Sequence, residues 1–148
     1  MNDVRREHSS CIMNTKLFVF GGFREYFRLD SIECLETDSS GGSWELIHLP
    51  VFTKRTHPAV LAIDDNQIVI LGGWDNERLN DVIVYNDDDR TAELVAYADR
   101  RFDCLSYPQL DGDNNMVALV RLSSGERTIL KFFPKSNDVT ISHQLVRP

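Results

Sequence analysis

The chain has 148 residues, of which 42% are hydrophobic and 26% are charged, a balance typical of a folded globular protein and not of a disordered one. Its formal net charge of -7 argues against a nucleic-acid ligand, because a phosphate backbone would be repelled on average. No apolar run reaches the roughly 18 residues that a membrane helix needs, and the first seven residues lack the apolar stretch of a signal peptide. We therefore expect a cytoplasmic protein that contacts neither nucleic acid nor membrane.

Short runs rich in β-branched and aromatic residues recur along the whole chain. In chain order they occupy residues 9–13, 16–20, 31–36 and 44–48, then 57–63, 67–71, 81–86 and 92–96, then 104–109, 115–122, 128–133 and 139–145. Stretches rich in Asp, Asn, Ser and Gly separate them. Short apolar runs that stop at turn residues predict strands, and no segment has helical periodicity.

Two of these runs end in a pair of glycines. Gly21-Gly22 follows the run at 16–20, and Gly72-Gly73 follows the run at 67–71, 51 residues later. A repeated run with the same ending indicates an array of similar structural units.

Other landmarks recur at nearly the same distance. Arg6-Glu7-His8 precedes the first glycine pair and Arg55-Thr56-His57 the second, a shift of 49 residues. Leu29-Asp30-Ser31-Ile32 follows the first pair and Leu79-Asn80-Asp81-Val82 the second, a shift of 50. This agreement makes the repeat hard to obtain by chance.

A third, weaker copy follows. Arg101 matches Arg55 at a shift of 46 residues, and the stretch from Asp113 to Leu119 matches that from Asp65 to Leu71 at a shift of 48. Val120-Arg121 stands where the glycine pair would be. Four strands in each unit of about 50 residues predict the blade of a β-propeller.

This pattern resembles the kelch repeat. The resemblance rests on these residues of the first two units: Arg6, His8, Gly21-Gly22, Leu29, Ile32–Leu35 and Trp44, then Arg55, His57, Gly72-Gly73, Leu79 and Tyr85. It implies an all-β chain, a partial β-propeller of about three four-stranded antiparallel kelch blades within one region. The blades would span about residues 5–50, 51–98 and, in degenerate form, 99–148. Leu35 and Ala92 depart from the aromatic residues usual in the family, and the third unit lacks both glycine pair and tryptophan.

Most of the repeated residues are expected to be structural. Gly21, Gly22, Gly72 and Gly73 would end each second strand and allow another backbone to approach closely. Trp44 and Tyr85 would pack between blades.

Three blades are few for a propeller, because closed rings use four to eight. The chain could be part of a longer protein, or an open array that needs a partner. Two copies could also close a ring of six blades.

The residue types needed for chemistry do not cluster. Cys11, Cys34 and Cys104 form no close pair, which favours free, buried thiols. His8 and Cys11 have no second pair at ligand spacing, and the residues after Asp111 lack the pattern of a calcium loop. We therefore expect no catalytic, cofactor-binding or metal-binding residue.

The loops between second and third strands are the best candidates for binding. They combine aromatic residues with arginine, types enriched among residues that dominate binding energy. The candidate contact residues are Arg24, Tyr26, Arg28, Trp74 and Arg78. The loops from fourth to first strands would add Phe52, Thr53 and Lys54, then Asp99 and Arg100. For Trp74 the alternative role is to cover the blade edge.

These features favour a non-enzymatic module that binds other proteins. The resemblance suggests a substrate-recruiting adaptor of ubiquitin ligases or a cytoskeletal scaffold. The alternatives are a propeller enzyme, such as a carbohydrate oxidase or a sugar-isomerising protein, and a non-functional remnant of a longer kelch protein. The excess of acidic residues in 59–115 would also suit a basic partner.

Overall fold

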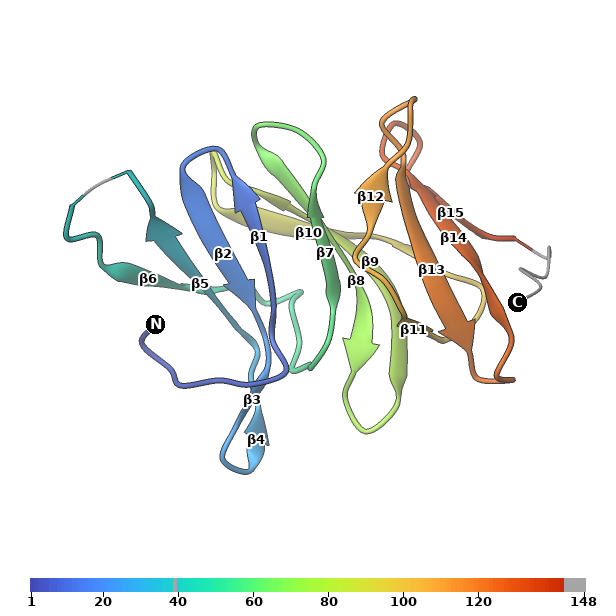
Figure 1. Cartoon of the computed structure of the whole chain (residues 1–148), viewed down its shortest axis with the longest axis horizontal. Helices are drawn as coiled ribbons and strands as arrows, with labels where there is room; N and C mark the ends of the chain where they lie inside the picture. The colour runs from blue at the N-terminus through green and yellow to red at the C-terminus, as the bar shows by residue number, and fades with distance from the viewer. Residues whose placement is uncertain (39, 143–148) are drawn as a thin grey trace.

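Three antiparallel sheets stand side by side in the computed structural model, which describes residues 1–38 and 40–142 (Figure 1). The first sheet consists of β1 (Ser9–Met13), β2 (Lys16–Phe20), β5 (Ser31–Glu36) and β6 (Trp44–His48). The second sheet consists of β7 (Ala59–Ala62), β8 (Gln67–Trp74), β9 (Arg78–Asn86) and β10 (Thr91–Tyr97). The third consists of β11 (Phe102–Cys104), β12 (Gln109–Leu110), β13 (Met116–Leu122), β14 (Arg127–Phe133) and β15 (Asp138–Ile141). A small hairpin, β3 (Phe23–Arg24) and β4 (Phe27–Arg28), extends from the first sheet.

This arrangement confirms the predicted all-β partial propeller of four-stranded antiparallel blades, one blade per sheet. In the first blade the four predicted strands have the observed bounds. Among residues 1–38 and 40–142, no helix has the length and apolar character that crossing a bilayer would require.

In the second blade, the prediction that the glycine pair ends the second strand is wrong. Strand β8 continues through Gly72 and Gly73 to Trp74, with a bulge between Leu71 and Gly73. The two glycines have φ angles of +51° and +110°, and their lack of a Cβ makes this bulge possible. Strand β9 accordingly begins at Arg78, earlier than predicted.

In the third blade, the predicted single strand at 104–109 is split into β11 and β12, which both pair with β13. Residues 105–108 separate the two pieces. Pro108 has no N–H to donate to a ladder. The Oγ of Ser106 instead accepts a hydrogen bond from the N–H of Leu119 at 3.2 Å.

The other strands of the third blade follow the prediction more closely. Strands β13 and β14 lie where the second and third strands were expected. The predicted strand at 139–145 corresponds to β15 as far as Ile141, and residues 143–148 lie outside the described part of the chain.

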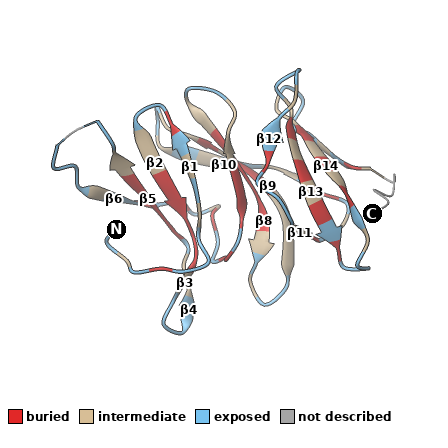
Figure 2. Ribbon diagram, in the orientation of Figure 1, coloured by how far each residue is buried: buried red, intermediate tan, exposed pale blue. Residues whose placement is uncertain are grey.

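Strand β8 lies in the middle of the array, where Figure 2 colours many residues as buried, and both of its faces are packed. Ile68 and Ile70 belong to the core between the first and second blades, and Val69 and Leu71 to the core between the second and third. All four are fully buried. A strand packed on both faces needs consecutive apolar residues, which explains this run.

The end blades differ from the middle one. In β13 the buried residues alternate with less buried ones, so only one face is packed. On the outer face of the first blade, Ile12 and Leu46 remain 65% and 43% exposed. Part of that face is covered by the N-terminal segment, whose backbone N–H groups at Asn2 and Asp3 donate to the buried carboxylate of Glu33.

Each glycine pair lies where two chain segments cross. A Cβ on Gly22 would lie 2.8 Å from the carbonyl oxygen of Arg6, and a Cβ on Gly73 would lie 2.8 Å from that of Thr56. Arg6 and Thr56 therefore occupy equivalent positions. The predicted equivalence of Arg6 with Arg55 is wrong by one residue.

The equivalent of Arg55 is Arg5. Both are buried, and each Nη1 donates to the carbonyl of the first glycine in its own blade, Gly21 at 2.8 Å and Gly72 at 3.0 Å. The same shift separates the two histidines: His57 is equivalent to Glu7, and both have a left-handed backbone, with φ of +51° and +58°.

An ionic network ties the first two blades together. The Nζ of Lys16 donates to Asp87 at 2.6 Å, and Arg90 lies 2.9 Å from Glu45. The hydrogen bond to Asp87 raises the pKa of Lys16. Burial acts to raise the pKa of Asp87, but hydrogen bonds from Lys16 and Tyr85 outweigh it and lower that pKa. The pair is therefore charged at neutral pH and holds the two blades in register.

Candidate functional site

The connections between strands lie on two opposite edges of the array (Figure 1). The edge formed by the loops between second and third strands we call the hairpin edge, comprising residues 23–28, 75–77 and 123–126. The opposite edge we call the turn edge, which includes residues 14–15, 63–66, 87–90, 111–115 and 134–137.

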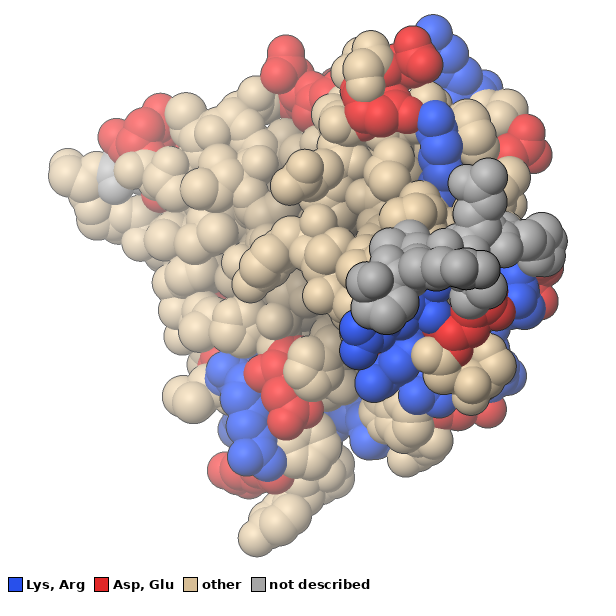
Figure 3. Space-filling model, turned by 45° about the vertical axis from the view of Figure 1, so that its right-hand side comes forward, with Lys and Arg blue, Asp and Glu red and all other residues tan. Residues whose placement is uncertain are grey.

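The two edges differ in charge. Three turns of the turn edge, at 63–66, 87–90 and 111–115, contain seven aspartates and one arginine. Figure 3 shows acidic side chains gathered along this upper edge, with basic side chains beside them at its right-hand end, and basic and acidic side chains intermixed along the lower edge. The excess of acidic residues in 59–115 thus lies largely on the turn edge, opposite the hairpin edge that carries the candidate binding loops.

An arginine is paired with an aromatic ring at the base of each of the first two hairpins. Phe23 pairs with Arg28 across β3 and β4, and Trp74 pairs with Arg78 across β8 and β9. Each guanidinium carbon lies 5.9 Å from the ring centroid of its partner. Arg6 lies over the Phe23 ring as well, at 5.1 Å. Contacts of this kind hold the planar arginine head in a defined orientation.

These pairs line one groove of about 650 Å³ that spans all three blades. Its charged lining residues are Arg6, Glu7, Arg28, Arg78, Asp103 and Arg121. Four arginines therefore face two carboxylates, so the groove is basic in a chain whose net charge is negative.

The carboxylates within reach of these arginines are few and shared. The Oδ2 of Asp103 lies 2.8 Å from the Nε of Arg78 and accepts a hydrogen bond from Arg121 at 3.1 Å. Arg28 lies 3.5 Å from Asp75 and donates to the side chain of Asn76 at 3.2 Å. A single carboxylate between two arginines leaves positive charge unneutralised.

The structure brings three of the five candidate contact residues together. Arg28, Trp74 and Arg78 line the groove. Arg24 and Tyr26 belong to the β3–β4 hairpin but not to the groove lining, since Arg24 pairs with Asp3 and Tyr26 is 87% exposed at the hairpin tip.

Sequence reasoning missed Arg6, Asp103 and Arg121. Each comes from a segment that was treated as scaffold or as degenerate. A signal was present for Arg121, which stands at the position of the missing glycine pair and therefore at the base of the third hairpin.

Some residues expected elsewhere lie in the interior. Phe52 was expected in an exposed binding loop, and this is wrong: it is 2% exposed, and its ring lies 6.2 Å from that of Phe20 between the blades. Tyr85, by contrast, was expected to pack between blades, and it does: it is fully buried, with its ring 5.7 Å from that of Phe18. The expectation that Trp44 packs between blades is wrong for the described residues: Trp44 is half-buried in β6 and belongs to neither of their core clusters.

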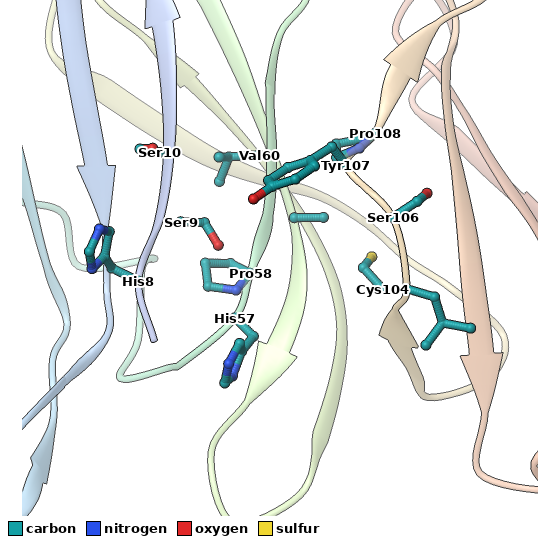
Figure 4. Close-up of a pocket in the computed structure, with 12 residues that line it drawn as sticks. His8, Ser9, Ser10, His57, Pro58, Val60, Cys104, Ser106, Tyr107 and Pro108 are labelled. Atoms are coloured by element: carbon teal, nitrogen blue, oxygen red, sulfur yellow. The ribbon is translucent and has the colours of Figure 1, made fainter. Parts of the chain in front are cut away.

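A second hollow, of about 470 Å³, opens between the innermost strands (Figure 4). His8, His57, Cys104 and Tyr107 line it, but no lysine, arginine, aspartate or glutamate does. Burial raises the pKa of Cys104 to about 12, so its thiol stays protonated and weakly nucleophilic at neutral pH. Within residues 1–38 and 40–142, no group of three His, Cys, Asp or Glu side chains is placed to hold a metal ion.

Comparison with known proteins agrees with this architecture. A model of the kelch motif matches residues 5–47 and 55–91, which together make up more than half of the chain. No curated protein sequence matches the chain closely enough to be counted a relative. Kelch repeats are typically protein-interaction modules. By this match and by its four-stranded blades, the chain belongs to the kelch-repeat family.

Proposed function

We propose that this chain is a non-enzymatic interaction module that binds a partner protein along the hairpin edge. The observation that carries the proposal is the repeated aromatic–arginine pair, Phe23 with Arg28 and Trp74 with Arg78, at the mouth of one groove. Aromatic residues and arginine are the types that most often dominate protein–protein binding energy.

The exposed hairpin tip supports the same proposal. Tyr26 and Phe27 are 87% and 66% exposed, although large aromatic rings are costly to leave in water. They project from a hairpin that is anchored beside the groove. A partner that fills the groove would cover these rings as well.

An adaptor or scaffold in the cytoplasm would use such a face. In either role the partner is held by a rigid frame of blades, and the loops determine which protein is recognised. The hairpin edge meets this need, because its loops differ in sequence while the blades that carry them repeat.

The outer face of the first blade is proposed to receive a further blade. Ile12 and Leu46 are apolar residues left partly exposed on this outer face. The corresponding face of the second blade, which carries Ile68 and Ile70, packs against the first blade. A second copy of the chain, or blades of a longer protein, would cover Ile12 and Leu46. A light-scattering mass of one chain at micromolar concentration would exclude the second copy.

The proposed binding face can be tested by site-specific cross-linking. A photoreactive amino acid at position 26 on the hairpin edge should capture a partner protein in an extract of the source cell. The same residue at position 88, an exposed site on the turn edge, serves as the control. Arg28→Ala, introduced into the chain that carries the photoreactive residue at position 26, should lower recovery of the captured protein about tenfold, with unchanged melting temperature. Equal capture from both positions, or capture from position 88 alone, would refute the proposal.

A further inference from the structure

The groove holds an excess of positive charge that the chain itself does not neutralise. Arg78 and Arg121 share the carboxylate of Asp103. Among the described residues, no carboxylate forms an ion pair with Arg6, and the one carboxylate that pairs with Arg28 is that of Asp75, at 3.5 Å. Donors left in this state favour a ligand that brings acceptor oxygens with negative charge.

The arginines are distributed regularly. Arg28, Arg78 and Arg121 stand at the base of the second-to-third-strand hairpin in the first, second and third blade. Each blade thus contributes one guanidinium to the same groove. Separate positive charges in a row match single negative charges spaced along an extended chain better than one compact multivalent anion.

The groove also offers apolar surface between its charges. Phe23 and Trp74 line it, and Trp74 is 37% exposed. A ligand side chain that packs on these rings would displace water from them. This combination of rings and arginines fits a peptide with both acidic and apolar residues.

A nucleic-acid strand fits less well. Aromatic rings and arginine could bind one, but the chain has a net charge of -7, and its turn edge concentrates aspartates. A short acidic segment enters the groove without passing that edge. A long phosphate backbone would be repelled by the molecule as a whole.

We propose that the ligand of this groove is an extended acidic segment of the partner protein, with carboxylates held by Arg28, Arg78 and Arg121 and an apolar side chain placed on Trp74. This inference rests on the proposed function and names the chemistry of its partner. The heads of Arg28 and Arg78, which the rings of Phe23 and Trp74 already hold in place, give up little conformational freedom when such a segment binds.

Fluorescence anisotropy with a labelled peptide of about 12 residues, alternating glutamate with glycine and serine and carrying one central leucine, tests the inference. The peptide should bind, and its glutamine counterpart should bind at least tenfold more weakly. Raising the salt concentration from about 50 to about 300 mM should weaken the acidic peptide about tenfold, because the contacts are screened.

Variants locate the binding. Arg78→Ala and Arg28→Ala should each weaken the acidic peptide about tenfold, and Arg78→Lys should restore only part of the affinity, because lysine lacks the planar fork. Arg90→Ala is the matched control, since this arginine is similarly exposed (34% against 28% for Arg78) but belongs to the turn edge. Melting curves check that each variant is folded.

Several results would overturn the inference. One is equal binding of the acidic and the glutamine peptides. Another is tighter binding of a single-stranded oligonucleotide than of the acidic peptide. A third is binding of inorganic phosphate without any binding of the peptide. If the cross-link at position 26 still captures a partner in such a case, the interaction module stands and only the acidic ligand fails. Absence of both peptide binding and cross-linking would remove the proposed function too.

Discussion

Gly73→Ala should lower the free energy of unfolding by about 3 kcal/mol, a large part of the roughly 5–15 kcal/mol that holds a typical domain folded. Two costs add at this position. The φ of +110° is strained for any residue with a Cβ. The new Cβ would also lie 2.8 Å from the carbonyl oxygen of Thr56 and 3.2 Å from the nitrogen of Pro58, and both are backbone atoms with little freedom to move.

Two other glycines separate these costs. Gly125 also has a positive φ, +87°, but a Cβ there would meet no heavy atom of the described residues within 4 Å. Gly125→Ala therefore measures strain alone and should cost about 1 kcal/mol. Gly112→Ala, with neither strain nor close neighbours, should change little. Urea unfolding followed by tryptophan fluorescence gives all three values. If Gly73→Ala lowered the free energy of unfolding no more than Gly125→Ala, this would contradict the close approach of the chain at Gly73 to the backbone of Thr56 and Pro58.

Arg55→Met should cost about 3–5 kcal/mol, because it leaves a paired charge and a buried carbonyl without their partner. The Arg55 side chain is fully buried. Its Nη1 and Nη2 donate to the two carboxylate oxygens of Asp81 at 2.9 and 2.8 Å, and Nη1 also donates to the carbonyl of Gly72 at 3.0 Å. Its guanidinium lies over Phe52 at 4.9 Å, so it joins the linker to the blade that follows.

Arg101→Met is the matched control. Arg101 follows the second blade as Arg55 follows the first, but its side chain is 46% exposed and pairs at the surface with Glu77. Its loss should cost less than about 1 kcal/mol. Arg55→Met combined with Asp81→Leu should recover part of the stability, because no lone charge then remains. If Arg55→Met and Arg101→Met lowered the free energy of unfolding equally, the buried ion pair would contribute no more to stability than the surface pair.

Much of the fold was predictable because each strand is a local pattern. The first blade's strands agree with the prediction residue for residue, since each run of apolar residues stops at a glycine or at a polar turn. The run before Gly72-Gly73 also indicated a strand. Periodicity and turn residues carry this information without knowledge of the neighbours.

The alignment of the entry segments could not be settled in the same way. Arg5 and Arg6 are adjacent, and either could match Arg55 by residue type. The structure decides between them because only Arg5 reaches the carbonyl of Gly21, whereas Arg6 turns toward Phe23. Which of two neighbours faces inward depends on the path of the backbone, which residue type alone does not specify.

The groove was only half predictable, for a similar reason. Arg28, Trp74 and Arg78 stand in loops that a blade must expose, so their composition pointed to binding. Arg6 and Arg121 join them only because three blades stack side by side and bring distant segments to one edge. The prediction for Phe52 was wrong in the opposite sense: it was expected in an exposed loop but is buried. A linker that connects packed blades can itself be part of the core.

Hydrogen exchange of the chain with and without the partner captured at position 26 tests the central claim most directly. Bound partner should slow exchange of backbone amides in residues 22–29 and 73–79, on the hairpin edge, and leave residues 63–67 and 86–91, on the turn edge, unchanged. Slowed exchange confined to the turn edge would place recognition on the acidic side of the array and contradict this account.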